Sequence, residues 1–229
     1  MFISNKIYHQ ADDRLLAFFH AQRTGGSQFK QFLRRAFGDT RVYAPQTVGN
    51  FLSWSRIDTK ALAGSTVYAG HENFEPKVLP GRAILPMTLL RDPAIRCLSL
   101  HRHCSSRPDH QLYELACKSD SLTFYREASE INPYYFNNTQ CLRVCGSTSF
   151  ERAEKCIQEH FFAVVTIDEV HDFARHISVL FGIDGRLPEK RAADAASNYD
   201  QISDEFRNAV YEANADDLKL YLKYSISSH

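Results

Sequence analysis

The stretch from Leu15 to Arg35, LLAFFHAQRTGGSQFKQFLRR, changes its hydrophobic pattern within a few residues. Apolar residues that suit a buried strand are followed by a loop with one arginine and two glycines, and a basic helical pattern starts at Ser27. Such a turn directs main-chain N–H groups and the positive end of the helix dipole to one point. The stretch therefore predicts a strand–turn–helix unit with a phosphate-binding loop, Arg23–Gln28, which we call the glycine loop. The alternative is a tight structural turn with Ser27 as the helix N-cap.

Strand-like and helix-like stretches alternate along the rest of the chain, which favours a central parallel sheet flanked by helices. Predicted strands lie at about residues 15–20, 41–44, 66–70, 84–90 and 162–167. Predicted helices lie at about residues 27–37, 93–105, 111–118, 137–145, 150–160, 170–182, 203–213 and 215–223. The turn-rich segment Gly182–Asp200 is predicted to be a surface connection. We expect one α/β domain over residues 1–229.

Composition excludes several classes of partner. Lys and Arg number 27 and Asp and Glu number 27, so no excess charge indicates nucleic acid or an anionic membrane as a partner. The longest N-terminal apolar run, Leu15 to Phe19, is too short for a membrane span or a signal peptide. The six cysteines form no C-x-x-C pair, which favours reduced, mostly buried thiols. We therefore expect a soluble, cytoplasmic protein with any anion site confined to a local cluster.

A second predicted strand-to-helix junction lies in Ala83–Cys104, AILPMTLLRDPAIRCLSLHRHC. Its apolar run ends at Arg91, Asp92 suits a helix cap, and Pro93 suits the first helical turn. Arg91 at the strand end and Ser99 in the second helical turn can converge on one anion. The positions on one face of this helix are Arg96, Ser99 and His103. The alternative is a capped surface helix with solvated arginines.

These two motifs resemble those of the sulfotransferases that use 3′-phosphoadenosine 5′-phosphosulfate (PAPS). FFHAQRTGGSQF is similar to the family's 5′-phosphosulfate loop, usually written around P-K-T-G-G-T or P-K-T-A-G-T. TLLRDPAIRCLSLHRH is similar to the strand and helix where an arginine, and a serine eight residues later, hold the 3′-phosphate, and Arg91 and Ser99 have that spacing. The match is closest to the branch with the heparan and chondroitin sulfotransferases and many bacterial members. Weaker similarity extends to Asn137–Gly146, Phe161–Gly182 and Glu212–Tyr221.

The resemblance implies a P-loop-like three-layer α/β fold and transfer of a sulfuryl group from PAPS to a hydroxyl acceptor. The expected acceptor is a carbohydrate or another hydroxylated small molecule, and the expected nucleotide product is 3′-phosphoadenosine 5′-phosphate (PAP). The residues that the resemblance assigns to nucleotide binding are Arg23, Thr24, Gly25, Gly26, Ser27, Gln28, Arg91 and Ser99.

The glycine loop departs from the family pattern at three positions. Arg23 stands where the family usually has lysine, Gln22 where it has proline, and Ser27 where it has threonine. Arginine keeps the positive charge but does not titrate near neutral pH. Sulfuryl transfer, like phosphoryl transfer, requires mainly positioning and charge stabilisation. Arg23 is therefore predicted to stabilise charge on the leaving phosphate and not to act as a general acid.

The predicted general base is His71 in TVYAGHENF. The resemblance aligns this segment with a G-H segment where glycan enzymes of this branch carry a catalytic histidine. A neutral imidazole can accept the acceptor's hydroxyl proton at pH 7, since its unperturbed pKa is about 6.5. The alternative is that His71 is a structural residue at a strand end. Glu72 is then the second candidate for the base. His20 is expected either to contact the sulfate or to end its strand.

Other interpretations of the chain remain open. A small-molecule kinase is the first alternative, but the kinase-type loop G-x-x-x-x-G-K-[ST] requires a lysine after the last glycine, and Ser27 occupies that position. A nucleotide-binding or interaction protein without turnover is the second. HRHC and CLRVC have spacings that suit a metal, but no second ligand pair accompanies them, so no metal is expected. The following aromatic residues are expected in the core rather than in an acceptor cleft: Phe124, Tyr125, Tyr134, Tyr135 and Phe136.

Overall fold

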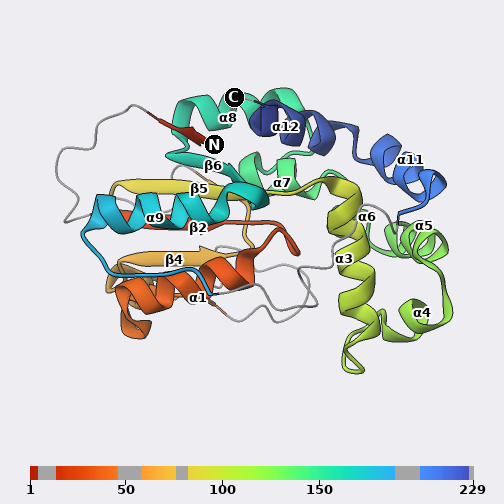
Figure 1. The fold of residues 1–229 in the computed structure, drawn as a ribbon, viewed down its shortest axis with the longest axis horizontal. Coiled ribbons are helices and arrows are strands. Elements are labelled where there is room, and N and C mark those ends of the chain that lie inside the picture. Colours follow the sequence, from red (N-terminus) through yellow and green to blue (C-terminus); the bar gives the residue numbers. More distant parts are fainter. Residues whose placement is uncertain (5–13, 46–57, 76–81, 189–201, 227–229) are drawn as a thin grey trace.

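The computed structural model describes residues 1–4, 14–45, 58–75, 82–188 and 202–226. Its centre is a six-stranded sheet with the strand order β1-β6-β5-β2-β4-β3 (Figure 1). The strands are β1 (Phe2–Ile3), β2 (Leu15–Phe19), β3 (Val42–Tyr43), β4 (Val67–Gly70), β5 (Ile84–Leu90) and β6 (Ala163–Thr166). The five predicted strands are confirmed within two residues at either end.

The predicted parallel sheet is present, and it has one antiparallel edge strand that the sequence did not predict. β2, β3, β4, β5 and β6 pair in parallel, whereas β1 pairs antiparallel with β6 through Phe2 and Val164. β1 is only two residues long, so it has too few residues to show a strand period in the sequence. An antiparallel edge strand on an otherwise parallel sheet is common in α/β folds.

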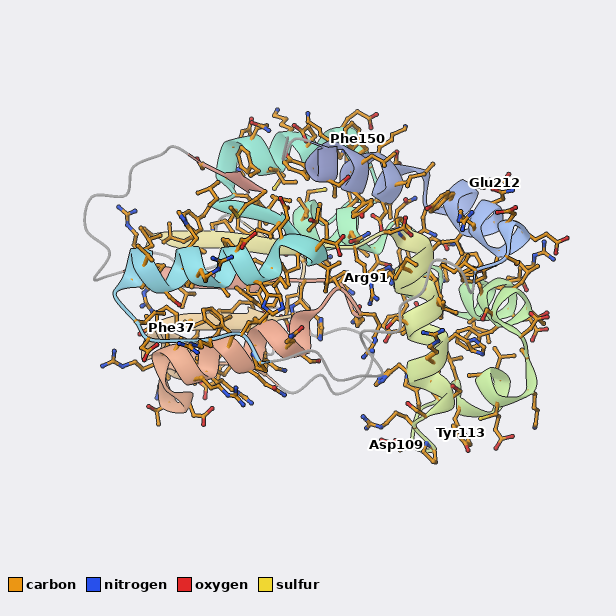
Figure 2. The ribbon with its side chains drawn as sticks, viewed as in Figure 1. Phe37, Arg91, Asp109, Tyr113, Phe150 and Glu212 are labelled. Carbon is orange, nitrogen blue, oxygen red and sulfur yellow. The ribbon has the colours of Figure 1, made fainter. Side chains whose placement is uncertain are left out.

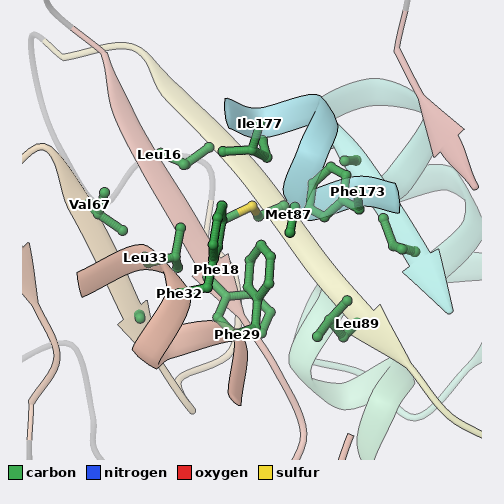
Figure 3. Close-up of a cluster of buried hydrophobic side chains, with 14 of the residues drawn as sticks. Leu16, Phe18, Phe29, Phe32, Leu33, Val67, Met87, Leu89, Phe173 and Ile177 are labelled. Atoms are coloured by element: carbon green, nitrogen blue, oxygen red, sulfur yellow. The ribbon is translucent and has the colours of Figure 1, made fainter. Parts of the chain in front are cut away.

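Alternate residues of β2 pack on opposite faces of the sheet. Leu16 and Phe18 contribute to the cluster that Figure 3 shows, in which Phe29 and Phe173 project from two covering helices. These helices are α1 (Gly26–Phe37) and α9 (Val170–Phe181). All five residues of β2 are buried, which explains why this strand reads as a continuous apolar run.

The opposite face packs against a second set of helices through a cluster that includes Leu15, Ala17 and Phe19. These helices are α7 (Thr139–Cys145), α8 (Phe150–His160) and α12 (Ala215–Ile226). The structure therefore has three layers, with helices on both faces of the sheet (Figure 1). This arrangement confirms the predicted α/β class.

A separate group of helices gathers beyond one end of the sheet and forms its own hydrophobic cluster (Figure 1). These helices are α3 (Pro93–Ser105), α4 (Tyr113–Lys118), α5 (Ser121–Ile131), α6 (Pro133–Phe136) and α11 (Asp204–Ala213). The remaining short elements are η1 (Asp39–Arg41), α2 (Thr59–Ala63) and η3 (Ile167–Glu169). The single domain remains a prediction.

The sequence did not predict α2, α5 and α6, whereas all eight predicted helices are present. α5 begins after Asp120, whose side chain accepts a hydrogen bond of 2.8 Å from the Thr123 N–H. This cap and the helical spacing of the buried residues Phe124, Tyr125 and Ala128 were local signals that the prediction missed. Of the predicted connection Gly182–Asp200, residues 183–188 form no regular element and 189–200 lie outside the described residues.

The order in which strands are added to the sheet reverses between the parallel neighbours β2 and β5, because β4 and β3 lie beyond β2 and β6 lies beyond β5. The helix after β2, α1, covers one face, whereas α7 and α8, which follow β5, cover the other. In open α/β sheets, ligands bind outside the carboxyl ends of strands at such a switch point. The fold therefore places a candidate site where β2 and β5 end.

No helix in the described ranges is long and apolar enough to cross a membrane. All six cysteines are free, and Cys97, Cys104 and Cys141 among them are buried. Burial raises the pKa of Cys97 to about 11 and that of Cys104 to about 12, so both are neutral thiols at pH 7.

Candidate functional site

A cavity of about 230 Å³ lies at the switch point, and residues that directly follow four of the strands contribute to it. His20 follows β2, His71 follows β4, Arg91 follows β5 and Ile167 follows β6. The predicted site residues that line this cavity are Arg23, Gly25, Gly26, Ser27, Gln28, His71 and Arg91. The two predicted binding motifs and the predicted base therefore meet in one place.

The glycine loop begins α1 without a side-chain cap. Gly25 is the N-cap residue with φ 94°, in the left-handed region, and α1 starts at Gly26. Ser27 is therefore in the first turn of the helix, which corrects the interpretation of this residue as the N-cap. No side chain caps α1, so its first N–H groups remain oriented toward the cavity.

Both loop glycines are required by close approach. A Cβ atom at Gly26 would overlap the imidazole ring of His20, and one at Gly25 would overlap the side chain of Ile167. Thr24, which the resemblance assigns to nucleotide binding, is fully buried, and its hydroxyl donates a hydrogen bond of 2.9 Å to the Ala21 carbonyl. The Thr24 side chain therefore holds the turn, while its neighbours face the cavity.

Arg23 connects the two predicted binding motifs. Its main chain has φ 69°, and its Nε donates a hydrogen bond of 3.1 Å to the Ser99 hydroxyl. Arg91 donates from Nη1 to the Arg23 carbonyl at 2.9 Å. Figure 2 shows Arg91 between the sheet and α3. Ser99 is thus reached through Arg23 and is not among the described residues that line the cavity.

The cap of α3 agrees with its prediction. Asp92 Oδ1 accepts hydrogen bonds from the Ala94 and Ile95 N–H groups at 2.8 and 3.0 Å. Arg96 was predicted on one helix face with Ser99, but its guanidinium is fully buried and donates to the Phe136 carbonyl at 2.5 Å. Arg96 therefore fastens α3 to α6 and does not face the cavity.

The two histidines are in contact behind the glycine loop. Nδ1 of His71 lies 2.9 Å from the carbonyl oxygen of His20, and the two ring centroids are 4.2 Å apart. A carbonyl only accepts hydrogen bonds, so Nδ1 carries the hydrogen and Nε2 keeps a lone pair. The His20 ring stacks on Phe18 with centroids 4.3 Å apart. His71 therefore has the tautomer that a base requires.

Burial keeps both histidines uncharged near neutral pH. It lowers the pKa of His71 to about 4, and the hydrogen bond with His20 acts in the opposite direction. Burial also lowers the pKa of His20 well below its usual range, and repulsion from His71 when it is protonated, from Lys30 and from Arg143 adds to this effect.

Glu72, the alternative base, is buried away from the described cavity lining. Within the described part of the chain, neither of its carboxylate oxygens has a hydrogen-bond partner. Burial raises the pKa of this carboxyl, while the charge of Arg143 acts to lower it. His71 therefore lines the cavity, whereas Glu72 does not.

Several residues of the lining were not predicted: Gln22, Ile95, Ile167, Asp168 and Tyr221. Ile167 and Asp168 directly follow β6, so the rule that site residues follow parallel strands would have identified them. Tyr221 comes from α12, and no sequence feature places it near the glycine loop. His103, one turn after Ser99, also lines the cavity, and burial followed by the Arg23 charge lowers its pKa to about 4.

The aromatic residues of the helical group divide between core and surface. Phe124, Tyr125 and Phe136 are buried, as predicted. Tyr134 is 58% exposed, which contradicts the prediction, and Tyr135 is buried at the edge of the cavity. Among the residues that the structure describes, no group of three His, Cys, Asp or Glu side chains is placed to hold a metal ion.

No family model and no curated protein matches the sequence. The fold is similar to that of a sulfotransferase from Alicyclobacillus acidocaldarius, with 13% identity, a TM-score of 0.52, and coverage of 92% of this chain and 96% of that one. It is also similar to mouse sulfotransferase SULT7A1 complexed with PAP, with 9% identity, a TM-score of 0.54, and coverage of 94% and 86%. The chain therefore has the three-layer α/β fold of these sulfotransferases.

Proposed function

We propose that this protein is a sulfotransferase that moves a sulfuryl group from PAPS to a hydroxyl acceptor. The observation that carries the proposal is the shared cavity of the uncapped α1 N-terminus, the Arg23–Arg91 pair and the neutral imidazole of His71. The first two suit the phosphates of a nucleotide, and the third suits the acceptor hydroxyl. The likeness to the PAP complex of SULT7A1 is in accord with this nucleotide.

In the proposed reaction, the acceptor oxygen attacks sulfur while the bond between sulfur and the 5′-phosphate oxygen breaks. The hydroxyl proton passes to Nε2 of His71, and PAP leaves with the bonding electrons. Arg23 and the first N–H groups of α1 stabilise the charge that grows on the departing phosphate. Arg91 holds the 3′-phosphate, while Ser99 orients Arg23 through its hydroxyl. Neither proton transfer nor charge stabilisation in this scheme requires a metal.

The acceptor is proposed to be a carbohydrate, which rests on the resemblance to the heparan and chondroitin branch. A cavity that combines Asp168, Tyr135 and Tyr221 offers hydrogen-bonding groups and aromatic surface to a sugar. A screen of hydroxylated acceptors with labelled PAPS tests this assignment, and transfer only to non-carbohydrate acceptors would overturn it.

The proposed nucleotide is tested by comparing PAP with ADP, which lacks the 3′-phosphate. A ligand that binds only the folded state raises the free energy of unfolding by RT ln(1 + [L]/Kd). PAP should therefore raise the Tm far more than ADP at equal concentration. Equal shifts for both nucleotides would overturn the proposal, and a larger shift with ATP would indicate a kinase. PAP binding without transfer to any acceptor would indicate a binding protein.

Arg91→Ala should remove most of the difference between PAP and ADP. A charge-assisted hydrogen bond contributes about 1.5–3 kcal/mol, so the PAP affinity should fall by roughly 10- to 150-fold. The matched control is Arg102→Ala on α3, because Arg102 is exposed and lies outside the described cavity lining. A folded Arg91→Ala protein that still prefers PAP would show that another residue holds the 3′-phosphate.

A further inference from the structure

Gln140, a buried residue of α7, forms hydrogen bonds with both the N–H and the carbonyl of Arg91. The Arg91 N–H donates to Gln140 Oε1 at 2.8 Å, and Gln140 Nε2 donates to the Arg91 carbonyl at 2.9 Å. Arg91 lies between the end of β5 and the cap of α3. The planar amide carries a donor and an acceptor on neighbouring atoms and keeps both at neutral pH, which matches the N–H and carbonyl of one residue.

Asp217 of α12 fixes the position of Gln140. Its two carboxylate oxygens accept hydrogen bonds from the Gln140 N–H at 3.0 Å and the Cys141 N–H at 2.8 Å. Asp217 is fully buried. Asn138, the N-cap residue of α7, has a left-handed main chain and provides no side-chain cap, so Asp217 serves as the cap from another helix.

The orientation of Arg91 in turn determines that of the glycine loop. Arg91 Nη1 donates to the Arg23 carbonyl, and Arg23 is a non-glycine residue with positive φ. This conformation costs about 1 kcal/mol or more and persists when surrounding contacts hold it. Arg23 then reaches the Ser99 hydroxyl. The Gln140 amide therefore contacts Arg91 directly and Arg23 through Arg91.

We infer that Gln140 is a positioning residue that sets Arg91 for the 3′-phosphate of the nucleotide, with Asp217 as its support. The inference rests on the proposed function, because the 3′-phosphate is what Arg91 is proposed to bind. Gln140 itself is not among the described residues that line the cavity, so it acts through Arg91. Replacing Gln140 should therefore change the preference for PAP over ADP without removing any protein group that contacts the nucleotide.

The test replaces the amide by an uncharged side chain of similar length, Gln140→Met. The affinities for PAP and ADP are measured by calorimetry, together with the Tm of the unliganded protein. We expect the PAP affinity to fall roughly tenfold, because the charge-assisted hydrogen bond to the 3′-phosphate weakens when its donor is misplaced. The ADP affinity should change little. The ratio of PAP affinity to ADP affinity should therefore fall toward the ratio expected for the Arg91→Ala protein.

The matched control is Asn214→Leu, which removes an equally buried amide. Asn214 accepts a hydrogen bond from the Asn138 N–H at 2.9 Å and donates one to the Val210 carbonyl at 3.0 Å. These partners are not among the described residues that line the cavity. The control should lose stability and keep the PAP preference.

A second variant, Gln140→Glu, keeps the inference testable if Gln140→Met does not fold. A carboxyl group reproduces both hydrogen bonds to Arg91 only when it is protonated, so this variant should prefer PAP more at pH 6 than at pH 9, relative to the native protein. A native PAP-to-ADP ratio in folded Gln140→Met, or in Gln140→Glu at both pH values, would overturn the inference and leave the proposed function intact. A native protein that does not distinguish PAP from ADP would instead overturn the proposed function.

Discussion

The arginine side and the histidine side of the cavity lie at the ends of neighbouring parallel strands but have opposite electrostatic character. Arg23 and Arg91 are partly buried and carry permanent charge, with hydrogen bonds that tie the glycine loop to α3. His20 and His71 are packed ring to ring and are uncharged near neutral pH. One side keeps positive charge available, whereas the other excludes it.

The difference shows how a cationic site can contain a usable base. Arg143 and Lys30 both act to lower the pKa of His71, but burial is the largest cause. A histidine in water beside an incoming polyanion would be protonated near neutral pH more readily, and could no longer accept a proton. Desolvation therefore keeps the proposed proton-accepting group uncharged, although it shares one cavity with the groups proposed to stabilise negative charge.

The largest expected effect is on the histidine side. His71→Ala should lower the rate of sulfuryl transfer by about 10²–10⁴-fold, because the acceptor hydroxyl loses its general base. The PAP affinity should remain nearly unchanged. Initial-rate kinetics and calorimetry on the same preparation check both statements. In the native protein, the acid limb of the kcat/KM profile should lie near the His71 pKa of about 4 and disappear in the variant.

A loss of PAP binding and stability together in His71→Ala would instead identify a structural histidine. Near-native turnover in the folded variant would remove His71 from the mechanism. Glu72→Gln would then be the next variant, since Glu72 is the other candidate base.

A smaller effect is expected on the arginine side. Arg23→Ala should lower turnover by about 10²-fold, which is typical for removal of one donor that stabilises a developing negative charge. Some loss of PAP affinity should accompany it, in contrast to His71→Ala. Arg23→Lys is the matched control and should be tolerated because it keeps the charge. Similar losses for the lysine and alanine variants would show that the guanidinium geometry, and not its charge, is essential.

The smallest expected effect is on stability. The folded pKa of His71 is about 4 and the unfolded value is about 6.5, so the unfolded chain binds more protons between these values. Stability should therefore fall as the pH drops from 7 to 4, by about 1–3 kcal/mol for this residue. Urea unfolding at several pH values should give a shallower slope for His71→Gln than for the native protein. His176→Gln, at an exposed histidine of α9, is the control, and identical slopes for native and His71→Gln would contradict the assigned burial effect.

Much of the sheet followed from local sequence, whereas parts of the helical group did not. Strands β2 and β5 were predictable because their apolar runs end in residues that strands do not favour. The two residues of β1 and the four of α6 are too short to establish a period, and their positions depend on neighbours distant in sequence. Packing against other elements therefore determined the positions of β1 and α6, which the local sequence pattern did not indicate.

For the site, the sequence alone determined the chemical groups at the strand ends: the glycine loop, the Asp92 cap of α3 and the spacing of Arg91 and Ser99. These features are local, because each depends on residues within a few positions along the chain. Only the tertiary structure decided the tautomer of His71, through a carbonyl 51 residues away, and its lowered pKa, chiefly through burial. It also decided which helix holds Arg91, because Gln140 and Asp217 are 77 residues apart and meet only when α7 packs against α12. Hydrogen-bond partners and burial of this kind arise from long-range packing, and no local period encodes them.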